Sequence, residues 1–353
     1  MKIYLLLSIV PIIVSLFYNA TNIDGEEKKR SYCIICGIIL IFVVGMRNKS
    51  VGADMEHYYD IMKSAIDSPS WINYYDKDGQ EIGFQFFVFL LSRIFKNPQW
   101  LSFIATAISV TSMMVFCYRY SDNIRLSIAM YICLGLMGFH MTAVRQSIAM
   151  SICLFAYVFA ERKQLLPFVA LIILATLMHK TAIVFSLVYL ISYLELKPIP
   201  LFLVVIGIVL AVYYSPYLIG LANNIWNKEY SNKVLSGGYV AVSIYVLIFI
   251  FCIIVTKHPF EKNIDSMMFY ILIIGFVIYI ERYIGVLIAE RISFYFSFSQ
   301  LILLPNALKN GKIREKDKIA VEMVIYALCI LLFMYRLSDS NSDIMPFKFF
   351  WNA

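Results

Sequence analysis

Long apolar segments set the strongest limit on how this chain can fold. Of its 353 residues, 61% are hydrophobic and only 15% are charged, and the mean hydropathy is +0.76. A soluble domain of this size has too little interior to hide that much apolar surface. A bilayer core about 30 Å thick, in contrast, is crossed by about 20 apolar residues in a helix. We therefore expect an all-α polytopic integral membrane protein that forms one domain over 1–353.

The apolar segments divide into about twelve expected membrane spans. A retained first helix is expected because Tyr18-Asn19-Ala20 is a poor cleavage site for a signal peptide. The apolar stretch 164–195 is too long for one span, so we divide it at Met178-His179-Lys180-Thr181, its most polar point. The expected spans are 2–18, 31–46, 99–118, 124–140, 146–160, 164–178, 181–195, 199–219, 239–256, 264–281, 292–308 and 319–336.

The polar segment 47–98 is expected to be a loop outside the membrane with two amphipathic helices. In the first, at about 54–67, apolar residues recur at helical spacing. The second, at 82–96, is more apolar, but its fifteen residues reach only about 22 Å as a helix. Its polar residues Gln85, Ser92 and Lys96 also fall on one narrow stripe. We therefore expect this helix to lie flat in the membrane interface.

The basic residues decide the orientation. If 82–96 lies flat, the basic loops all fall on the same side, which the positive-inside rule assigns to the cytoplasm. If 82–96 crossed the membrane, the dense basic run 309–318 would lie outside. The flat placement is therefore preferred, with both termini outside. The basic groups are Lys28-Lys29-Arg30, Arg119 with Arg125, Arg162-Lys163, Lys197, Lys257 with Lys262, and Lys309 to Lys318.

Ionisable residues gather at the outward-facing ends of these spans. Such residues near hydrocarbon are energetically unfavourable and usually face a cavity or a partner, so each is a functional candidate. The alternatives are purely structural roles: His179 could donate a hydrogen bond to a backbone carbonyl at a helix end, and each Glu-Arg pair could be an internal salt bridge. The candidates are Arg47, Asp54, Glu81, His140, Arg145, Gln146, His179, Lys180, Glu281, Arg282, Glu290 and Arg291.

Several other chemistries find no support in the sequence. Cys33 and Cys36 have a metal or redox spacing, but no second pair accompanies them, so we interpret them as buried thiols. Zinc spacings, a P-loop, a glycine-rich dinucleotide turn and a serine-nucleophile elbow are all missing. We expect no metal and no cofactor. The net charge of +7 is ordinary for a membrane protein with basic loops on one side and does not indicate nucleic acid.

Arginines beside carboxylates suit a polyprenyl pyrophosphate that carries a sugar. Guanidinium groups hold the departing pyrophosphate, and a carboxylate or imidazole accepts the proton of an attacking sugar hydroxyl. Asp54 is our first candidate for this proton acceptor and His179 the second, with Glu81 and Glu290 as further catalytic candidates. Substrate binding is assigned to Arg47, Arg145, Gln146, Lys180, Arg282, Arg291 and Tyr295.

Five short blocks of the sequence resemble the EpsG family, a group of bacterial Wzy-type polysaccharide polymerases that includes many O-antigen polymerases. The resemblance covers about 45–305, and the order of elements is also similar to that of the broader GT-C glycosyltransferases. One departure is Thr181, where the family often has a serine shortly after the histidine. The blocks are Gly45-x-Arg47…Val51-Gly52-x-Asp54…Tyr58, Glu81-Ile82-Gly83-Phe84, Arg145-Gln146-Ser147-Ile148-Ala149, His179-Lys180-Thr181-Ala182 and Arg291-Ile292-Ser293-x-Tyr295.

The resemblance implies a polymerase in the bacterial inner membrane with its active site facing the periplasm. Such an enzyme moves a growing glycan from one undecaprenyl pyrophosphate carrier onto a lipid-linked repeat unit, in a pathway with a flippase and a chain-length regulator. Two alternatives stay open: a ligase or acyltransferase that uses the same carriers, and a flippase or transporter of lipid-linked sugars. The positions that match the family's polar blocks are Arg47, Asp54, Glu81, Arg145, His179 and Arg291.

Overall fold

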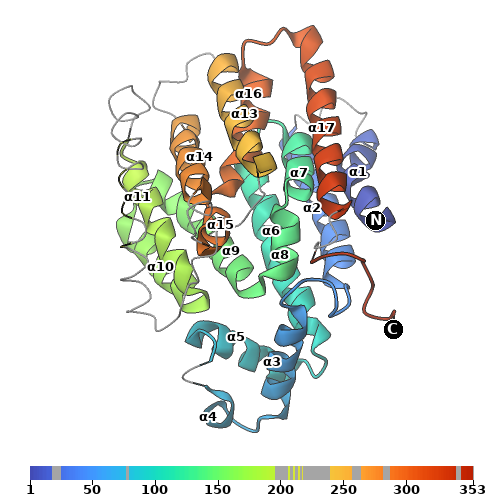
Figure 1. Cartoon of the computed structure of the whole chain (residues 1–353), viewed down its shortest axis with the longest axis vertical. Helices are drawn as coiled ribbons and strands as arrows, with labels where there is room; N and C mark the ends of the chain where they lie inside the picture. Colours follow the sequence, from blue (N-terminus) through green and yellow to red (C-terminus); the bar gives the residue numbers. More distant parts are fainter. Residues whose placement is uncertain are drawn as a thin grey trace.

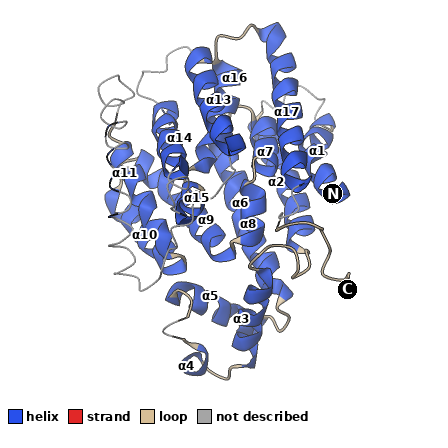
Figure 2. Cartoon of the chain, in the orientation of Figure 1, coloured by secondary structure: helices blue, strands red, loops and turns tan. Residues whose placement is uncertain are grey.

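The computed structural model confirms the all-helical class. It describes residues 1–17, 25–76, 79–194, 206, 210, 214, 217, 239–256, 264–280, 287–338 and 343–352. Within these residues the only extended pairing is an isolated bridge between Arg47 and Phe349 (Figure 2). Most helices pack side by side in a bundle, and three lie beyond one of its ends (Figure 1).

The bundle contains both long helices and short helical pieces. They are α1 (Lys2–Leu16), α2 (Glu26–Gly45), α6 (Gln99–Tyr120), α7 (Ile124–Cys133), α8 (Leu136–Thr142), α9 (Val144–Glu161), α10 (Leu165–Met178), the 3₁₀ helix η1 (Lys180–Ser186), α11 (Leu187–Ile191), α13 (Tyr239–Val255), α14 (Ile264–Ile280), α15 (Leu287–Ser293), the 3₁₀ helix η3 (Ser297–Ser299), α16 (Gln300–Asn310) and α17 (Glu315–Ser338). The helices at the end of the bundle are α3 (Met55–Asp67), α4 (Trp71–Tyr74) and α5 (Ile82–Ile94).

The surface of the bundle is apolar, as expected for helices in contact with lipid. Leu166 is 84% exposed, Ile254 66% and Leu331 65%, and side chains of this kind on many helices indicate a membrane-embedded protein. Among the described helices, α6, α9 and α17 are long and apolar enough to cross a bilayer. The bent pair α7 and α8 would make a fourth span, and six further apolar helices are shorter.

Three predicted spans differ from the observed helices, and a fourth lies largely outside the described residues. The span 124–140 is broken between α7 and α8, which meet at 49°. The break occurs at Gly135, whose φ of +97° is a left-handed conformation that ends a helix. The span 181–195 begins as the 3₁₀ helix η1, and 292–308 is interrupted between α15 and η3. The span 199–219 falls mostly on residues that the structure does not describe.

The basic loops that the structure describes gather at one end of the bundle, as the predicted topology requires. Three hydrogen bonds of 2.6 Å tie the corresponding helix ends together: Tyr118 to Glu26, Tyr120 to Glu161 and Asn310 to Asp122. The segments 28–30, 119–125, 162–163 and 309–318 therefore lie near one another. The remaining members of this group, Lys197, Lys257 and Lys262, are outside the described residues.

The polar segment between α2 and α6 leaves and re-enters the bundle at the opposite end. Gln99, at the start of α6, donates its side-chain amide to the carbonyls of Gly45 at 2.8 Å and Arg47 at 3.1 Å. Because both ends of this segment meet there, α5 does not cross the bundle and instead packs against α3 and α10 (Figure 1). Its placement in a membrane interface stays a prediction.

The C-terminal segment 343–352 runs along residues 46–52 and fastens the loop to the bundle. The backbone N–H groups of Asn48 and Gly52 donate to the carbonyls of Lys348 and Asp343, each at 2.8 Å. Gly52 has a φ of +113°, and an added Cβ would lie 2.6 Å from the carbonyl oxygen of Met141. Glycine is therefore required where the loop crosses α8, just before Asp54.

Candidate functional site

The site begins where α5 approaches the end of α10. A Cβ added to Gly83 would lie 2.7 Å from the carbonyl oxygen of Leu177, so only glycine lets the first turn of α5 pack this closely. Glu81 directly precedes α5, and His179 directly follows α10. This packing therefore places the Glu81 side chain beside His179, although the two residues are far apart in the sequence.

The Glu81 carboxylate accepts hydrogen bonds from three groups. Its Oε1 lies 3.1 Å from His179 Nδ1 and 3.3 Å from the backbone nitrogen of Lys180, which begins η1. Its Oε2 is ion-paired with Nη1 of Arg145, in the first turn of α9. The carboxylate thus joins the N-terminal ends of α5, α9 and η1.

These contacts keep Glu81 ionised. Its side chain is 9% exposed, and burial raises its pKa, but the hydrogen bond from His179 and the charge of Arg145 outweigh that effect. Together they hold the pKa of Glu81 well below its usual range. A carboxylate with a depressed pKa is a weak base, so Glu81 is better suited to orienting its partners than to accepting a proton.

The same hydrogen bond sets the protonation pattern of the imidazole. An ionised carboxylate only accepts hydrogen bonds, so the proton between the two residues belongs to His179 Nδ1. The lone pair of a neutral ring is then on Nε2. Among the described residues, no side chain or backbone group forms a hydrogen bond with that atom, and the histidine side chain is 19% exposed. His179 is therefore oriented and accessible.

Arg145 connects this cluster to the loop. Its Nε lies 3.4 Å from the hydroxyl oxygen of Tyr58 on α3, and its side chain is 24% exposed. Burial raises the pKa of Tyr58, which keeps the hydroxyl neutral. Lys180, also predicted to bind substrate, has an exposed side chain at the same edge.

A second ion pair lies between the loop and α15. Asp54, the residue before α3, has its Oδ2 3.9 Å from Nη2 of Arg291, and the two side chains are 37% and 58% exposed. Gln146 donates its amide to the backbone carbonyl of Arg291 at 2.6 Å, which fixes α15 against α9. Both charged groups of the Asp54–Arg291 pair are open to solvent and available to a ligand.

Gln146 and Tyr295 are buried, at 2% and 1% exposed. The Thr181 hydroxyl donates to the Tyr295 hydroxyl at 3.2 Å, which ties η1 to the chain that follows α15. In this structure Gln146 positions Arg291, and Tyr295 positions η1 through Thr181. Their direct contact with substrate, assigned from the sequence, stays a prediction.

Arg47 is completely enclosed by protein. Only 1% of it is exposed, and its guanidinium donates at 2.9 Å to the carbonyls of Val44 and Met141 and to the hydroxyl of Thr106. Burial lowers its pKa to about 10, so it stays charged at neutral pH. These contacts hold the start of the loop against α6 and α8. A role for Arg47 in substrate binding stays a prediction that this conformation does not support.

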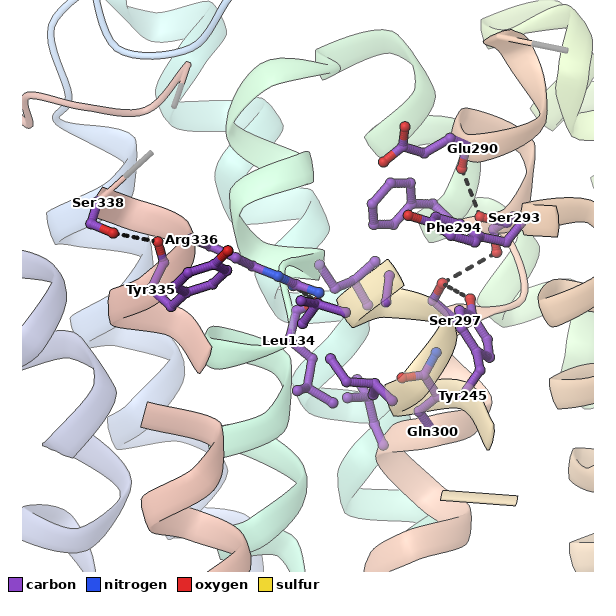
Figure 3. Close-up of a pocket in the computed structure, with 16 residues that line it drawn as sticks. Leu134, Tyr245, Glu290, Ser293, Phe294, Ser297, Gln300, Tyr335, Arg336 and Ser338 are labelled. Carbon is purple, nitrogen blue, oxygen red and sulfur yellow. Dashed lines mark hydrogen bonds between the residues drawn. The ribbon is translucent and has the colours of Figure 1, made fainter. Parts of the chain in front are cut away.

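Glu290 lies apart from the Glu81 cluster. Together with Arg336 of α17 it lines two neighbouring cavities, of about 650 and 440 Å³. Figure 3 shows the larger one. Arg336 is not among the residues predicted from the sequence, although an arginine at the outer end of an apolar helix is the signal that identified the other candidates. Glu281 and Arg282 lie outside the described residues. His140 is buried in the core, 3.0 Å from the Tyr131 hydroxyl.

A metal site is not formed by the part of the chain that the structure describes. No group of three or more His, Cys, Asp or Glu side chains there is arranged to hold an ion. The positively charged side chains at this end of the bundle include Arg145, Lys180 and Arg291.

A lipid-facing helical bundle with Glu81, Arg145 and His179 clustered at the end opposite the basic loops defines a membrane-embedded protein with a polar site at one end. The sequence profile of the EpsG family matches residues 30–349, so most of the chain is covered. The chain belongs to the EpsG family, a family of Wzy-type polymerase-like proteins, which confirms the resemblance found in the five blocks. Searches of curated proteins and of solved structures each found no match.

Proposed function

We propose that this protein is a polysaccharide polymerase that transfers a growing glycan from undecaprenyl pyrophosphate to a lipid-linked repeat unit. The observation that carries the proposal is the Glu81–His179–Arg145 cluster, which combines an oriented base with a cation. Its position, opposite the basic loops, corresponds to the periplasmic face of the bacterial inner membrane under the positive-inside rule.

In the proposed reaction, Nε2 of His179 accepts the proton of the attacking sugar hydroxyl. The hydroxyl oxygen bonds to the anomeric carbon of the donor glycan, and the bond from that carbon to the pyrophosphate oxygen breaks. The electron pair leaves with undecaprenyl pyrophosphate. Glu81 holds the ring through Nδ1 and stabilises the imidazolium that forms, which is the usual arrangement for an oriented histidine base.

Arg145, Arg291 and Lys180 are the groups proposed to bind the pyrophosphate. Arg145 uses Nη1 for Glu81 and keeps further N–H donors, while Arg291 is mostly exposed. Guanidinium groups match two phosphate oxygens at once. Cations at this position stabilise the charge that develops on the leaving group, and no nucleotide donor is needed.

Asp54 was the first candidate for the base from the sequence and is kept as the alternative. Its carboxylate faces Arg291 rather than an orienting hydrogen-bond donor. An acid beside a pyrophosphate-binding arginine is placed to position that arginine. The geometry therefore favours His179 as the proton acceptor and Asp54 as a positioning residue.

Two other activities use similar groups. A ligase or acyltransferase acting on the same carriers would also use outer arginines and a histidine, and a flippase would move lipid-linked sugars across the bundle. A transporter is expected to carry charged groups in mid-membrane helices, whereas α10 and α13 contain none. This distribution favours an enzyme at one face.

The polysaccharide made by a deletion strain separates these activities. We expect lipopolysaccharide that carries a single repeat unit, visible as one band above the lipid A core on a gel, and recovery of a ladder when the gene is restored. Long free polymer in the deletion strain would instead indicate a ligase. Complete loss of the repeat unit at the outer face would indicate a flippase.

A further inference from the structure

The larger of the two cavities opens among helices that carry none of the residues in the Glu81 cluster. It lies between α7, α13, α14, α15, α16 and α17, and its volume of about 650 Å³ is in the range of ligand sites. Figure 3 shows the Arg336 side chain reaching toward Leu134, across from the polar wall. The main polar residues of the lining are Tyr245, Glu290, Ser293, Ser297, Gln300 and Arg336.

Arg336 is held in place by the break between α7 and α8. Its Nη1 donates to the carbonyl of Leu134 at 2.6 Å, at the end of α7. An added Cβ on Gly135 would lie 2.7 Å from that nitrogen, so the glycine makes room for the guanidinium. A guanidinium carries five N–H donors. Among the described residues, Arg336 forms a hydrogen bond only through Nη1, to the Leu134 carbonyl. Glu290 lines the same cavity, and its carboxylate acts electrostatically on Arg336. The guanidinium N–H groups that do not bond to Leu134 are the donors left for an anion in the cavity.

The opposite wall supplies neutral hydrogen-bonding groups. The hydroxyl oxygens of Tyr245 and Ser297 are 3.0 Å apart, and the Ser297 hydroxyl is also 3.2 Å from the carbonyl of Ser293. The Gln300 side chain lies beside them (Figure 3). A guanidinium facing hydroxyl and amide groups is suited to a ligand that combines phosphate oxygens with sugar hydroxyls.

The larger cavity adjoins the smaller one, which Arg291 of α15 lines. Glu290 and Arg336 line both cavities, and Arg291 lines the smaller one of about 440 Å³. Arg291 is in turn paired with Asp54. The larger cavity is therefore separated from Arg291 by the smaller cavity, whose lining it shares at Glu290 and Arg336.

We propose that the Arg336 cavity binds the phosphate-bearing head group of a lipid-linked sugar, at a site distinct from the Arg145 and Arg291 site. The ligand class rests on the proposed function, because a reaction between two lipid-linked glycans requires the protein to hold two pyrophosphate carriers at the same time. The Glu81 cluster holds cations for one of them, and Arg336 supplies a separate cation for the other.

Equilibrium dialysis of farnesyl pyrophosphate against the full-length protein in lipid nanodiscs tests this assignment. We expect two molecules bound per wild-type chain and one per chain in Arg336→Gln, with affinity at the Arg336 site reduced by roughly tenfold or more. Arg145→Gln should lose the other molecule. Arg119→Gln, which changes an exposed arginine at the end of α6, is the matched control and should still bind two.

Each other result has a defined meaning. One molecule per wild-type chain, lost in Arg145→Gln and kept in Arg336→Gln, would overturn the second site and leave the proposed function standing. No binding by the wild type would contradict both. Inorganic pyrophosphate that binds the Arg336 site as tightly as farnesyl pyrophosphate would overturn the assignment to a lipid head group and indicate free phosphate.

A measurement on the unmodified protein guards against misfolding of Arg336→Gln. A photoreactive diazirine analogue of farnesyl pyrophosphate is crosslinked to the wild-type protein, and the labelled peptides are mapped by mass spectrometry. We expect labels within 287–300 and 333–338 in addition to those near Arg145. Labels confined to segments near Arg145 and His179 would overturn the proposal.

Discussion

Glu81 and His179 are 98 residues apart in the sequence and meet through a 3.1 Å contact between Oε1 and Nδ1. The contact depends on Gly83, which brings the start of α5 against the end of α10. It leaves Nε2 of the histidine as the one basic atom of the ring. The relationship therefore gives the two residues different roles, a fixed anion and an oriented base.

Removing the Glu81 charge should lower stability in a pH-dependent way. Glu81→Gln leaves Arg145 and His179 without their shared carboxylate, so its Tm should lie below that of the wild type at neutral pH. Because the pKa of Glu81 is held below its usual 4.5, the stabilisation is complete above that pH and is lost as the pH falls through the lowered pKa. Thermal unfolding in detergent should show a constant difference from about pH 7 to about pH 5 and convergence in stronger acid.

A surface carboxylate provides the control for this pH series. Glu56 lies 3.6 Å from Lys49, and both side chains are more than half exposed, so Glu56→Gln should leave the Tm nearly unchanged at every pH. A Glu81→Gln difference that grows as the pH falls would contradict the assigned direction.

Lysine should not replace Arg145. Arg145→Lys keeps the charge and loses the planar fork that pairs with Glu81 and with phosphate. A contact worth about 2–4 kcal/mol in the transition state corresponds to a rate loss of roughly thirty- to thousand-fold, and the same is expected for Arg291→Lys. The measurement is the rate of chain extension, compared between wild type and variants that are present in the membrane in equal amounts. Arg119→Lys is the control and should extend chains at the wild-type rate. Normal chain extension by either variant would show that only the positive charge of that arginine is needed, and would contradict the two-point contact with phosphate.

The packing at Gly83 should matter as much as the charged groups. In Gly83→Ala the new methyl group meets the Leu177 carbonyl at 2.7 Å, so α5 must shift away from α10 and carry Glu81 with it. Overpacking of this kind destabilises by about 1–3 kcal/mol, and chain extension should fall although every charged residue is intact. Gly138→Ala, whose nearest contact would be Ile344 at 3.4 Å, is the matched control. Equal activity in both variants would show that this packing does not set the site.

The Arg47→Lys variant tests whether Arg47 has a structural role or binds substrate. Arg47→Lys loses most of the hydrogen bonds to Val44, Thr106 and Met141, so we expect a lower Tm. In the fraction that folds, the KM for the lipid-linked repeat unit should be unchanged. A many-fold rise in KM at unchanged Tm would support the substrate contact predicted from the sequence.

The position of the site was predictable from the sequence because it follows from topology. Apolar segment lengths and the distribution of basic residues together place Glu81, Arg145 and His179 at one end of the bundle. The partner of each residue was not predictable in the same way. Arg47 and Arg145 are both arginines at the outward end of a predicted span. Arg47 is nevertheless enclosed by the backbone carbonyls of Val44 and Met141, a contact that the sequence pattern does not reveal.

The breaks in the spans depend on tertiary contacts. The stretch 292–308 is apolar enough on average to be predicted as one span, but it is interrupted close to Phe294, which stacks on Phe139 of α8 with ring centroids 4.0 Å apart. The break at Gly135 is linked to Arg336, which occupies the space a side chain would fill. Hydropathy measures only the affinity of a segment for lipid, so contacts of this kind fall outside what it reports.

The most direct test of the account is chain extension by purified His179→Gln protein supplied with a polyprenyl pyrophosphate repeat unit in liposomes. The wild type should convert the repeat into a ladder of longer glycans. His179→Gln keeps a polar side chain of similar reach but has no basic nitrogen, so it should leave single repeats, while Asp54→Asn should still produce a ladder at a reduced rate. A full ladder from folded His179→Gln, together with single repeats from Asp54→Asn, would contradict the assignment of His179 as the base.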